Sequence, residues 1–532
     1  MRQLLTLICT SLLFYENPAA LFAGQDAGIP DPVPRSHWSC RIIDDLGPRY
    51  RIPDTVPDRP QIPRSAIAKL FLELMEEVVR TSEAGGPAAI PAEDRERLAA
   101  LKQALQQYLV IESAYVTRQE TYERILEPPE EQTYLYRYGV KGFLSGEGTA
   151  NFAFSDFSYT PGRGVGLLLY RIRPYLEWRP FDWLEIEAEA QAYGFTLTPH
   201  RYTGFSLYQA YLELKPETLK ELHLKIGRQE FLYGSAFILG TNSFYEGLTF
   251  DAARLRIRPT PELTVDLLAG SYAVPFTRFF DGLFSGAYLT YAPAEGTSAE
   301  AYYFRDAGVM FSRSGEHLDY LGLRGTARFG ALSMEVEPVW ETGQIYNDST
   351  GTLDTVNAWG GHVDLFADLD VKGFKNTFTI GYARGSGSQE AADGGSSRRQ
   401  FSNIDNDTPL TGDMGFIADL SGVTVNGTNA SGLHIATVGW GINLLKNLNF
   451  TTTARYFQAD KTPSGVSPRL GTETDFILTW TLAEDTALIA AYDRFFTGNF
   501  FRDASGSSND MQYGYLMLQF NFSGGRKKMA GR

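Results

Sequence analysis

The chain has 532 residues, a formal net charge of −15 and a pI of about 5.0. Its 43% hydrophobic and 13% aromatic residues exclude a disordered chain, and two cysteines are too few for a disulfide scaffold. The acidic pI offers no surface for nucleic acid, and the absence of any run of 18 apolar residues excludes a protein that crosses a membrane with helices. The 52 glycines beside 29 tyrosines and 35 phenylalanines favour many strands and turns.

Residues 1–23 have the pattern of a secretory signal peptide. Arg2 supplies the positive charge, Leu4 to Phe14 form the apolar segment, and Ala23 is a small residue at the expected cleavage point. The alternative is a short buried helix at the N-terminus. After cleavage the mature chain would keep one cysteine, Cys40, to which we assign no function.

Two further regions precede the part with a strand pattern. Residues 24–63 are rich in proline and are predicted to form an irregular linker with polyproline II character. Residues 64–133 are predicted to contain a helical hairpin, because apolar residues recur at helical spacing over 67–79 and 98–109 with a Gly/Pro break between them. We favour two helices that pack only on each other over the alternative, a periplasmic plug, spacer or oligomerisation arm.

From Tyr134 to Phe522 the apolar residues alternate with polar ones, which is the period of a β-strand. In segment 183–193, apolar Leu184 and Ile186 alternate with Glu185 and Glu187. Segments of about ten residues with one apolar and one charged face are typical of strands that cross an outer membrane. Short and long connections alternate along this region, as the periplasmic turns and extracellular loops of such a protein do.

The sequence therefore predicts an all-β transmembrane barrel of about 18 antiparallel strands over residues 134–523. A small α-helical periplasmic region precedes it and a basic tail, residues 524–532, follows it. The alternative, a soluble β-protein, would need a second sheet to cover each apolar face. A barrel of this size leaves an aqueous channel. We therefore expect the protein in the outer membrane of a Gram-negative cell, in contact with its lipid.

The charged face of these strands would line the lumen. Pairing around a turn at 179–182 places Arg173 opposite Glu187 and Arg171 opposite Glu189, and Asp266 is expected across the next turn from Arg256. These rows of charge could select solutes. They could also pair only with one another and stiffen the wall. Other charged positions on this face are Arg254, Arg324, Arg328, Glu335, Glu337, His362, Asp364, Arg455, Glu473 and Asp475.

No catalytic or cofactor-binding pattern is present. The chain lacks G-x-S-x-G, H-E-x-x-H and Walker A sequences, and its six histidines are scattered. His200 and Ser206 would form a hydrolytic pair only if other groups oriented them. The stretch 385–431, rich in Gly, Ser, Asn and Asp, is predicted to be a solvated loop rather than a calcium site. We expect no enzyme activity, no cofactor and no bound metal.

The stretch 224–234, Leu-Lys-Ile-Gly-Arg-Gln-Glu-Phe-Leu-Tyr-Gly, is followed by Phe250-Asp251 and Arg254-Leu255. These residues resemble the alginate-export family of outer-membrane proteins, and the close resemblance covers residues 170–255. It implies a monomeric barrel whose narrow, arginine-lined lumen passes a polyanionic polysaccharide outward.

The resemblance also implies that Arg228 lines the constriction together with the neighbouring arginines. Strand parity instead places Arg228 on the lipid face, so this role requires a bulge at Gly227 that turns the side chain inward; otherwise Arg228 lies at the membrane rim. The predicted pore-lining residues are Arg171, Arg173, Glu187, Glu189, Arg228, Arg254, Arg256, Asp266, Arg324 and Arg328.

We interpret the chain as an outer-membrane channel for the passive passage of hydrophilic solutes, anionic or sugar-like, or of a polysaccharide. The alternative is a structural or complex-forming barrel whose helical arm binds an envelope partner. The added region before the barrel and the mixed charge of the lumen depart from the family pattern, so alginate itself does not follow.

Overall fold

The fold is that of a computed structural model of the chain. The described residues are 33–35, 37–52, 56–57, 59–62, 64–85, 90–109, 134–153, 158–197, 200–216, 218–219, 221–241, 246–273, 283–294, 296–307, 315–347, 351–395, 399–404, 409–483 and 485–527. The predicted signal peptide, residues 1–23, lies outside them, as do residues 110–133 of the predicted helical region and residues 528–532 of the predicted tail.

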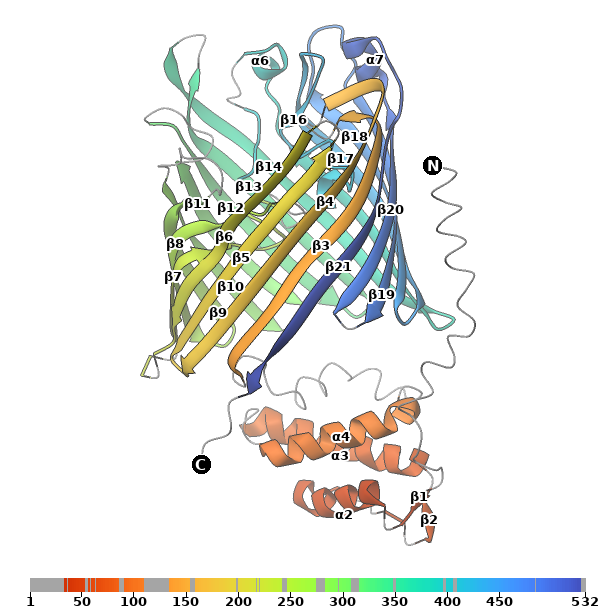
Figure 1. The fold of residues 1–532 in the computed structure, drawn as a ribbon. Coiled ribbons are helices and arrows are strands. Elements are labelled where there is room, and N and C mark those ends of the chain that lie inside the picture. Colours follow the sequence, from red (N-terminus) through yellow and green to blue (C-terminus); the bar gives the residue numbers. More distant parts are fainter. Residues whose placement is uncertain are drawn as a thin grey trace. The chain divides into compact units, whose positions relative to one another are not determined.

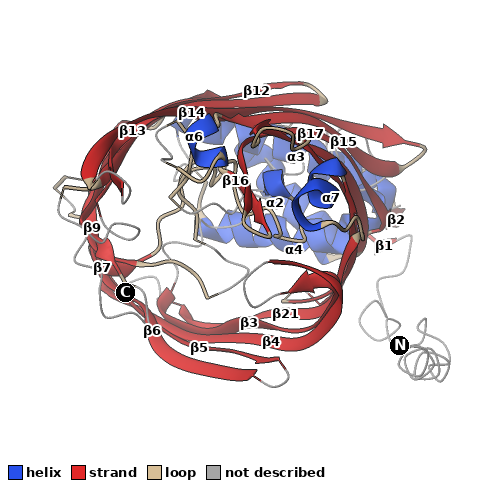
Figure 2. Ribbon diagram, turned by 90° about the horizontal axis from the view of Figure 1, so that it is seen from above, coloured by secondary structure: helices blue, strands red, loops and turns tan. Residues whose placement is uncertain are grey.

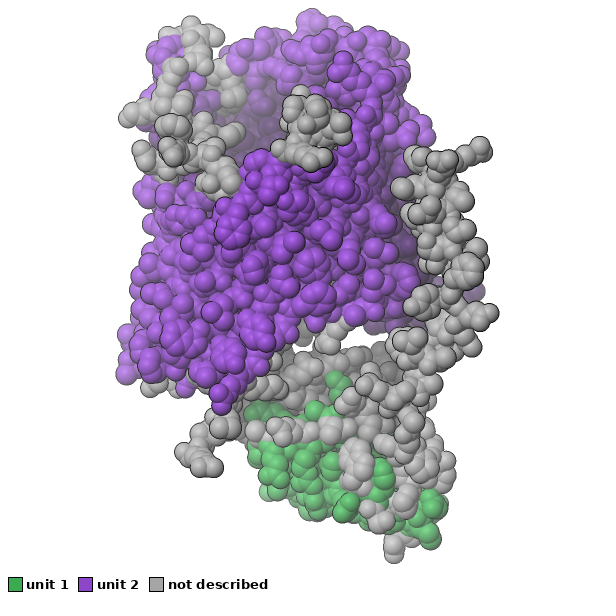
Figure 3. Space-filling view, viewed as in Figure 1, with its two compact units in different colours: residues 1–133 green, residues 134–532 purple. Residues whose placement is uncertain are grey.

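The chain divides into two compact units, residues 1–133 and 134–532 (Figure 3). The elements described in the first unit are β1 (Val33–Pro34), α2 (Trp38–Tyr50), β2 (Gln61–Ile62), α3 (Arg64–Gly85) and α4 (Ala92–Leu109). Across the described residues, no helix combines the length and the hydropathy needed to cross a membrane.

Helix α2 lies where the proline content predicts an irregular linker, so that prediction is wrong for residues 38–50. The His37 side chain begins the helix by accepting a hydrogen bond from the Ser39 amide, 3.3 Å away, and Arg51, in a left-handed conformation with φ of 60°, ends it. Pro48 is tolerated in the last turn. The helix forms because its apolar side chains, such as Leu46, are buried against the other two helices, and this packing outweighs the local preference.

The two predicted apolar stripes face the core of this unit. Helix α3 buries Phe71 and Leu74, and α4 buries Leu98 and Leu101. Helices α3 and α4 contact each other, and α2 packs against both. Residues 38–109 therefore form a three-helix core rather than an isolated hairpin.

The second unit is a closed barrel of 18 antiparallel strands, as the sequence predicts (Figure 1). Consecutive wall strands pair with each other, and β21 pairs with β3, so the wall has no free edge. The strands of the wall are β3 (Tyr134–Ala153), β4 (Ser158–Phe181), β5 (Leu184–Leu197), β6 (His200–Leu214), β7 (Leu222–Gln229), β8 (Phe250–Thr260), β9 (Leu263–Tyr272), β10 (Leu283–Ala294), β11 (Thr297–Ala307), β12 (His317–Phe329), β13 (Leu332–Asn347), β14 (Thr352–Val371), β15 (Phe374–Gly385), β17 (Thr428–Leu445), β18 (Leu448–Lys461), β19 (Arg469–Ala483), β20 (Thr486–Thr497) and β21 (Met511–Lys527).

The predicted alternation describes the two faces of the wall. On β4, Leu168 and Leu176 are exposed on the outer face, whereas Leu169 and Arg173 are buried on the inner face. Large exposed apolar side chains recur on the same outer face of the other strands. This outward apolar band and inward charge are what a barrel in lipid requires.

The last strand is longer than expected. Strand β21 continues to Lys527, with Arg526 opposite Tyr136 and Lys527 opposite Tyr134 of β3. The prediction of a basic tail is therefore wrong for residues 524–527. The long β3 offers backbone partners to this segment, and a ladder of hydrogen bonds orders it despite its charge.

Two connections fold into the barrel instead of extending away from it (Figure 2). We name the described residues between β7 and β8, 230–241 and 246–249, the first inner loop, and those between β15 and β17, 386–395, 399–404 and 409–427, the second inner loop. The second contains α6 (Gln389–Ala392), a 3-10 turn (Pro409–Thr411) and β16 (Gly422–Val425), which pairs with β17. Helix α7 (Asn499–Ser505) lies between β20 and β21.

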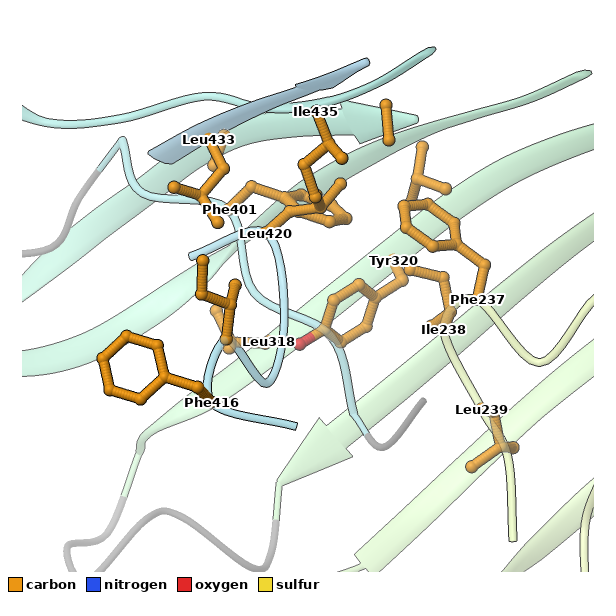
Figure 4. Close-up of a cluster of buried hydrophobic side chains, with 14 of the residues drawn as sticks. Phe237, Ile238, Leu239, Leu318, Tyr320, Phe401, Phe416, Leu420, Leu433 and Ile435 are labelled. Atoms are coloured by element: carbon orange, nitrogen blue, oxygen red, sulfur yellow. The ribbon is translucent and has the colours of Figure 1, made fainter. Parts of the chain in front are cut away.

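The prediction of a solvated loop at 385–431 is wrong, because this segment buries several large apolar residues. Phe401, Phe416 and Leu420 are almost fully buried (Figure 4). The Phe416 ring lies 5.8 Å from the ring of Phe152, in an edge-to-face arrangement. A few aromatic residues among many glycines and serines thus determine where the loop packs.

Candidate functional site: the charged lumen

Cations lie directly opposite one another on the inward face of strands β3 to β8. Lys141 of β3 is opposite Arg173 of β4, and Lys225 of β7 is opposite Arg254 of β8. Like charges in directly opposite positions destabilise a sheet. The wall therefore needs nearby carboxylates at both places, and the two places differ in how fully it supplies them.

The first pair is neutralised, and its arginine is buried. Lys141 Nζ lies 3.0 Å and Arg173 Nε 3.8 Å from the Glu189 carboxylate. Arg173 also donates to Gln191 Oε1 at 2.5 Å and to the backbone oxygen of Glu246 at 3.0 Å, and only 4% of its side chain is exposed. Because Glu246 belongs to the first inner loop, Arg173 anchors that loop to the wall.

The second pair is compensated less fully. Arg254 Nη2 lies 3.9 Å from Glu213 Oε1, and Lys225 Nζ lies 3.7 Å from the centre of the Tyr211 ring. The Tyr211 hydroxyl donates in turn to Glu187. Among the described residues, no carboxylate oxygen comes within 4.0 Å of Lys225 Nζ. Positive charge is therefore less fully matched here than at Lys141 and Arg173.

The predicted register between β4 and β5 is wrong, although the predicted faces are right. Strand β4 continues to Phe181, so the turn is formed by residues 182–183, later than expected. This shift moves the cross-strand partners of Leu167 to Trp178 by four residues. Arg171 therefore lies opposite Tyr193 rather than Glu189, and its guanidinium carbon is 4.9 Å from the centre of the Phe143 ring.

Arg256 and Asp266 form the cross-strand pair that the sequence predicts. The two residues are opposite each other in the ladder between β8 and β9. Arg256 Nε and Nη2 each lie 2.7 Å from the Asp266 carboxylate, and the hydroxyl of Tyr233 donates to the same carboxylate at 3.0 Å. Tyr233 belongs to the first inner loop, so this ion pair is a second anchor for that loop.

Arg228 does not face the lumen, and the constriction role that the resemblance implied is wrong for this residue. The ladders on both sides of β7 pass through Gly227 and Arg228 without a register shift, although Gly227 has a φ of +127°. Arg228 therefore stays on the outer face with Ile226. There it forms a bidentate ion pair with Asp251, with both N–O distances 2.8 Å. This pairing lowers the cost of an arginine on the outer face.

Arg324 and Arg328 share a strand face but not a site. Arg324 lies 2.6 Å from Glu300 and 2.8 Å from Glu335, within the wall of the lumen. Arg328 is exposed beside the short turn at Gly330, whose backbone oxygen it contacts at 3.5 Å. The structure thus separates Arg328 from the cluster around Arg324.

The inward face of β18 to β20 is acidic. Glu473 and Asp493 are fully buried, and Asp475 lies opposite Asp493 in the ladder. Arg455 contacts Asp475, and the Met414 amide of the second inner loop donates to Glu473 at 3.2 Å. Cations are thus concentrated on β3 to β8, while this part of the wall carries mainly carboxylates.

The two inner loops meet inside the barrel, an arrangement that sequence reasoning missed. The Ile404 amide donates to the backbone oxygen of Ile238 at 3.1 Å, and the Asn403 side chain donates to that of Phe237 at 3.3 Å. The rings of Phe237 and Phe401 stack with centres 5.9 Å apart. Large aromatic residues inside otherwise polar loops were the only sign of this arrangement in the sequence.

Comparison with known proteins extends the resemblance over most of the barrel. The family model described as alginate export matches residues 198–514. The crystal structure of Pseudomonas aeruginosa OpdQ is similar with a TM-score of 0.51 and 13% identity, over 73% of this chain and 99% of that one. OpdL of the same organism gives a TM-score of 0.50 and 15% identity, over 74% and 99% of the two chains. No curated protein sequence matches the chain.

A closed barrel with an apolar outer face and a charged interior defines an outer-membrane protein of the porin-like class. The chain belongs to the alginate export family, because the family model matches more than half of its length. Its location is the outer membrane of a Gram-negative cell.

Proposed function

We propose that the barrel is a passive channel for hydrophilic solutes that are anionic or sugar-like, and that these solutes pass along the wall formed by β3 to β8. The observation that carries the proposal is the cross-strand pair of Lys225 and Arg254. Two cations opposite each other reduce the stability of a sheet, so a role in binding an anion gives a reason for keeping them.

The surroundings of this pair suit a carboxylate or a sugar. The Arg254 guanidinium offers several fixed hydrogen-bond donors. Its nearest acidic partner, Glu213, is as far as 3.9 Å away, so donors remain for a solute. The Tyr211 ring beside Lys225 provides a flat apolar surface. These groups form a site that attracts negative charge without holding it by a complete set of ligands, as permeation requires.

The inner loops favour a small solute over a long polymer. Because the two loops hydrogen bond to each other inside the barrel, they occupy part of the width that 18 strands would otherwise leave open. We therefore extend the proposal to monomeric or short uronate-like solutes. The other interpretation, an arm that binds an envelope partner, gains no support, because the described apolar stripes of α3 and α4 are buried within their own unit.

The test is ion selectivity in planar bilayers. The double variant Lys225→Gln/Arg254→Gln should lower the ratio of anion to cation permeability by at least about fivefold, because each of the two unit charges near the path contributes about 1 kcal/mol. Arg228→Gln/Asp251→Asn changes charges on the outer face and serves as the matched control, with no expected effect. Unchanged selectivity in the first variant would refute the proposal, and block of current by a uronate but not by a neutral sugar would support it.

A further inference from the structure

A second cluster on the lumen wall has the composition of a metal site. Glu337 of β13 lies opposite His362 of β14, and Glu335 lies opposite Asp364 one step along the same face. His362 Nε2 is 3.6 Å from Glu337 Oε2 and 4.0 Å from Glu335 Oε1. The ligand atoms of Glu335, Glu337 and His362 all lie within 4.8 Å of one another.

These distances approach the geometry of a bound ion. Ligand atoms around a tetrahedral ion with bonds of about 2.0–2.1 Å lie about 3.3 Å apart. The His362–Glu337 and His362–Glu335 separations of 3.6 Å and 4.0 Å are already close to this value, and all three separations are within 4.8 Å. Side-chain shifts of up to about an ångström would bring the three ligand atoms around one ion. The His362 and Glu337 side chains are each only 2% exposed, so the donors face one another in a site shielded from bulk water.

Asp364 orients the imidazole for this role. Its Oδ2 lies 2.6 Å from His362 Nδ1, and this contact directs Nε2 toward the two glutamates. A carboxylate that holds the far nitrogen of a histidine ligand is a recurrent feature of metal sites, because it fixes the ring and increases its basicity. The cluster thus contains a carboxylate that orients the histidine, Asp364, in addition to the residues that would bind the ion.

A fourth atom that could bind an ion comes from the first inner loop. Ser235 Oγ lies 2.9 Å from Glu337 Oε2 and 3.4 Å from His362 Nε2. The Phe237 ring packs edge-on against the His362 ring, with centres 5.0 Å apart. An ion at this place would connect the loop to the wall through the Ser235 hydroxyl.

The charges around the cluster do not balance without a further cation. Glu300, Glu335, Glu337 and Asp364 contribute four carboxylates, and Arg324 contacts three of them, with distances of 2.6 Å to Glu300, 2.8 Å to Glu335 and 3.7 Å to Glu337. Over the described part of the chain, no other arginine or lysine lies within 4.0 Å of these carboxylates. Even a protonated His362, which lies beside three of them, leaves four carboxylates facing two cations. Buried charges are costly unless they are paired, and a divalent ion in place of that proton would raise the positive charge from two to three.

We propose that Glu335, Glu337, His362 and Ser235 bind a first-row divalent transition-metal ion on the lumen wall, with Asp364 as the group that orients His362. An imidazole nitrogen with carboxylate oxygens suits Zn²⁺ or Mn²⁺, whereas Ca²⁺ and Mg²⁺ prefer sites made of oxygen alone. The scattered histidines of the sequence led to the expectation of no metal, but this site needs only one of them.

Zinc retention by the full-length protein in detergent tests the site directly. After treatment with a chelator, incubation with ZnCl₂ and desalting, elemental analysis should find about one zinc ion per chain. His362→Ala and Glu337→Gln should lose it. His434→Ala is the matched control, because His434 also lies beside a carboxylate, Asp460 at 3.1 Å, but outside the cluster, so this variant should retain zinc.

Asp364→Asn keeps the shape of the cluster. It serves as a second variant in case the other substitutions prevent folding. It should weaken zinc binding about 10- to 100-fold while the barrel still shows heat-dependent migration on a gel. Wild-type protein that retains no zinc, a His362→Ala variant that retains as much as wild type, or Ca²⁺ binding equal to Zn²⁺ binding would each overturn the proposal. The measurement involves no ion flow, so its failure and a failure of the proposed channel selectivity are distinguishable.

Discussion

The helical unit buries its apolar residues, whereas the strands of the barrel wall also expose a band of them on their outer face. In the helical unit, Phe71 and Leu74 have no exposed surface. In the barrel, Leu168 is 64% exposed, whereas Glu189 and Asp493 are fully buried. The difference shows that the surrounding solvent, rather than residue type, decides what is buried. Water surrounds the first unit, and lipid surrounds the second.

The two arrangements also derive their stability from different sources. The helical unit depends on the hydrophobic effect, which acts where apolar side chains leave water. The barrel wall gains no such driving force between lipid and leucine, and relies on a closed ladder of backbone hydrogen bonds that lipid cannot replace. Its interior must then satisfy every buried charge by pairing. Substitutions in the helical core, on the lipid face and among the buried charges of the barrel should therefore change the free energy of unfolding by different amounts.

Removal of the Arg455 guanidinium should have the largest effect. Arg455 lies opposite Glu473 and contacts Asp475, so Arg455→Met would leave buried carboxylates without their cation. We expect a loss of about 4 kcal/mol in the free energy of unfolding, measured with urea in detergent. Arg328→Met, beside an exposed turn, is the control and should change stability little. A loss of less than about 1 kcal/mol would show that the cluster is neutralised in another way.

Leu74→Ala should act on the helical unit alone. Leu74 is fully buried in the three-helix core, and deletion of its side chain leaves a cavity that costs about 3 kcal/mol. The measurement is the circular dichroism of the helices during urea unfolding of the full chain, with the exposed Lys69→Ala as control. If the barrel lost its strand signal at the same urea concentration, the two units would not be energetically separate.

A charge on the outer face of the barrel should cost somewhat less. Leu323 is 58% exposed near the middle of β12, and Leu323→Arg would place an unpaired cation in lipid at a cost of about 2–3 kcal/mol. Unfolding from lipid vesicles measures this cost, and Leu323→Ala provides the comparison with a change of size alone. Equal stability of both variants would contradict the assignment of this face to lipid.

The sequence was sufficient for the features that repeat and insufficient for those that do not. The alternation of apolar and polar residues along 134–522 predicted the barrel. Counting every second residue along a strand placed Arg173 and Asp266 on its inward face. Register depends on where one turn falls, and the turn at 182–183 shifted every partner on β5. Parity also described Arg228 correctly, while the family resemblance, which required a bulge, did not.

Contacts between distant segments left still less trace in the sequence. Ser235 approaches His362 only because the first inner loop folds back onto β14, and no local pattern encodes that return. Helix α2 formed in a region whose prolines predicted a linker, because burial of Leu46 outweighed the local preference. Long-range packing thus decided the parts of the fold and of the site that periodicity could not reach.

The smallest predicted effect concerns Tyr50, a polar group buried in the helical unit. Its hydroxyl donates to Asp94 at 2.8 Å, and burial together with this hydrogen bond raises the pKa of Tyr50 above its usual range. Tyr50→Phe should cost about 1 kcal/mol at neutral pH. A raised pKa means that the folded state keeps a proton which the unfolded chain loses above about pH 10, so the stability of this unit should fall as the pH rises beyond that point. The decline, followed by helical circular dichroism in urea, should be shallower in Tyr50→Phe, and an unchanged decline would assign it to other groups.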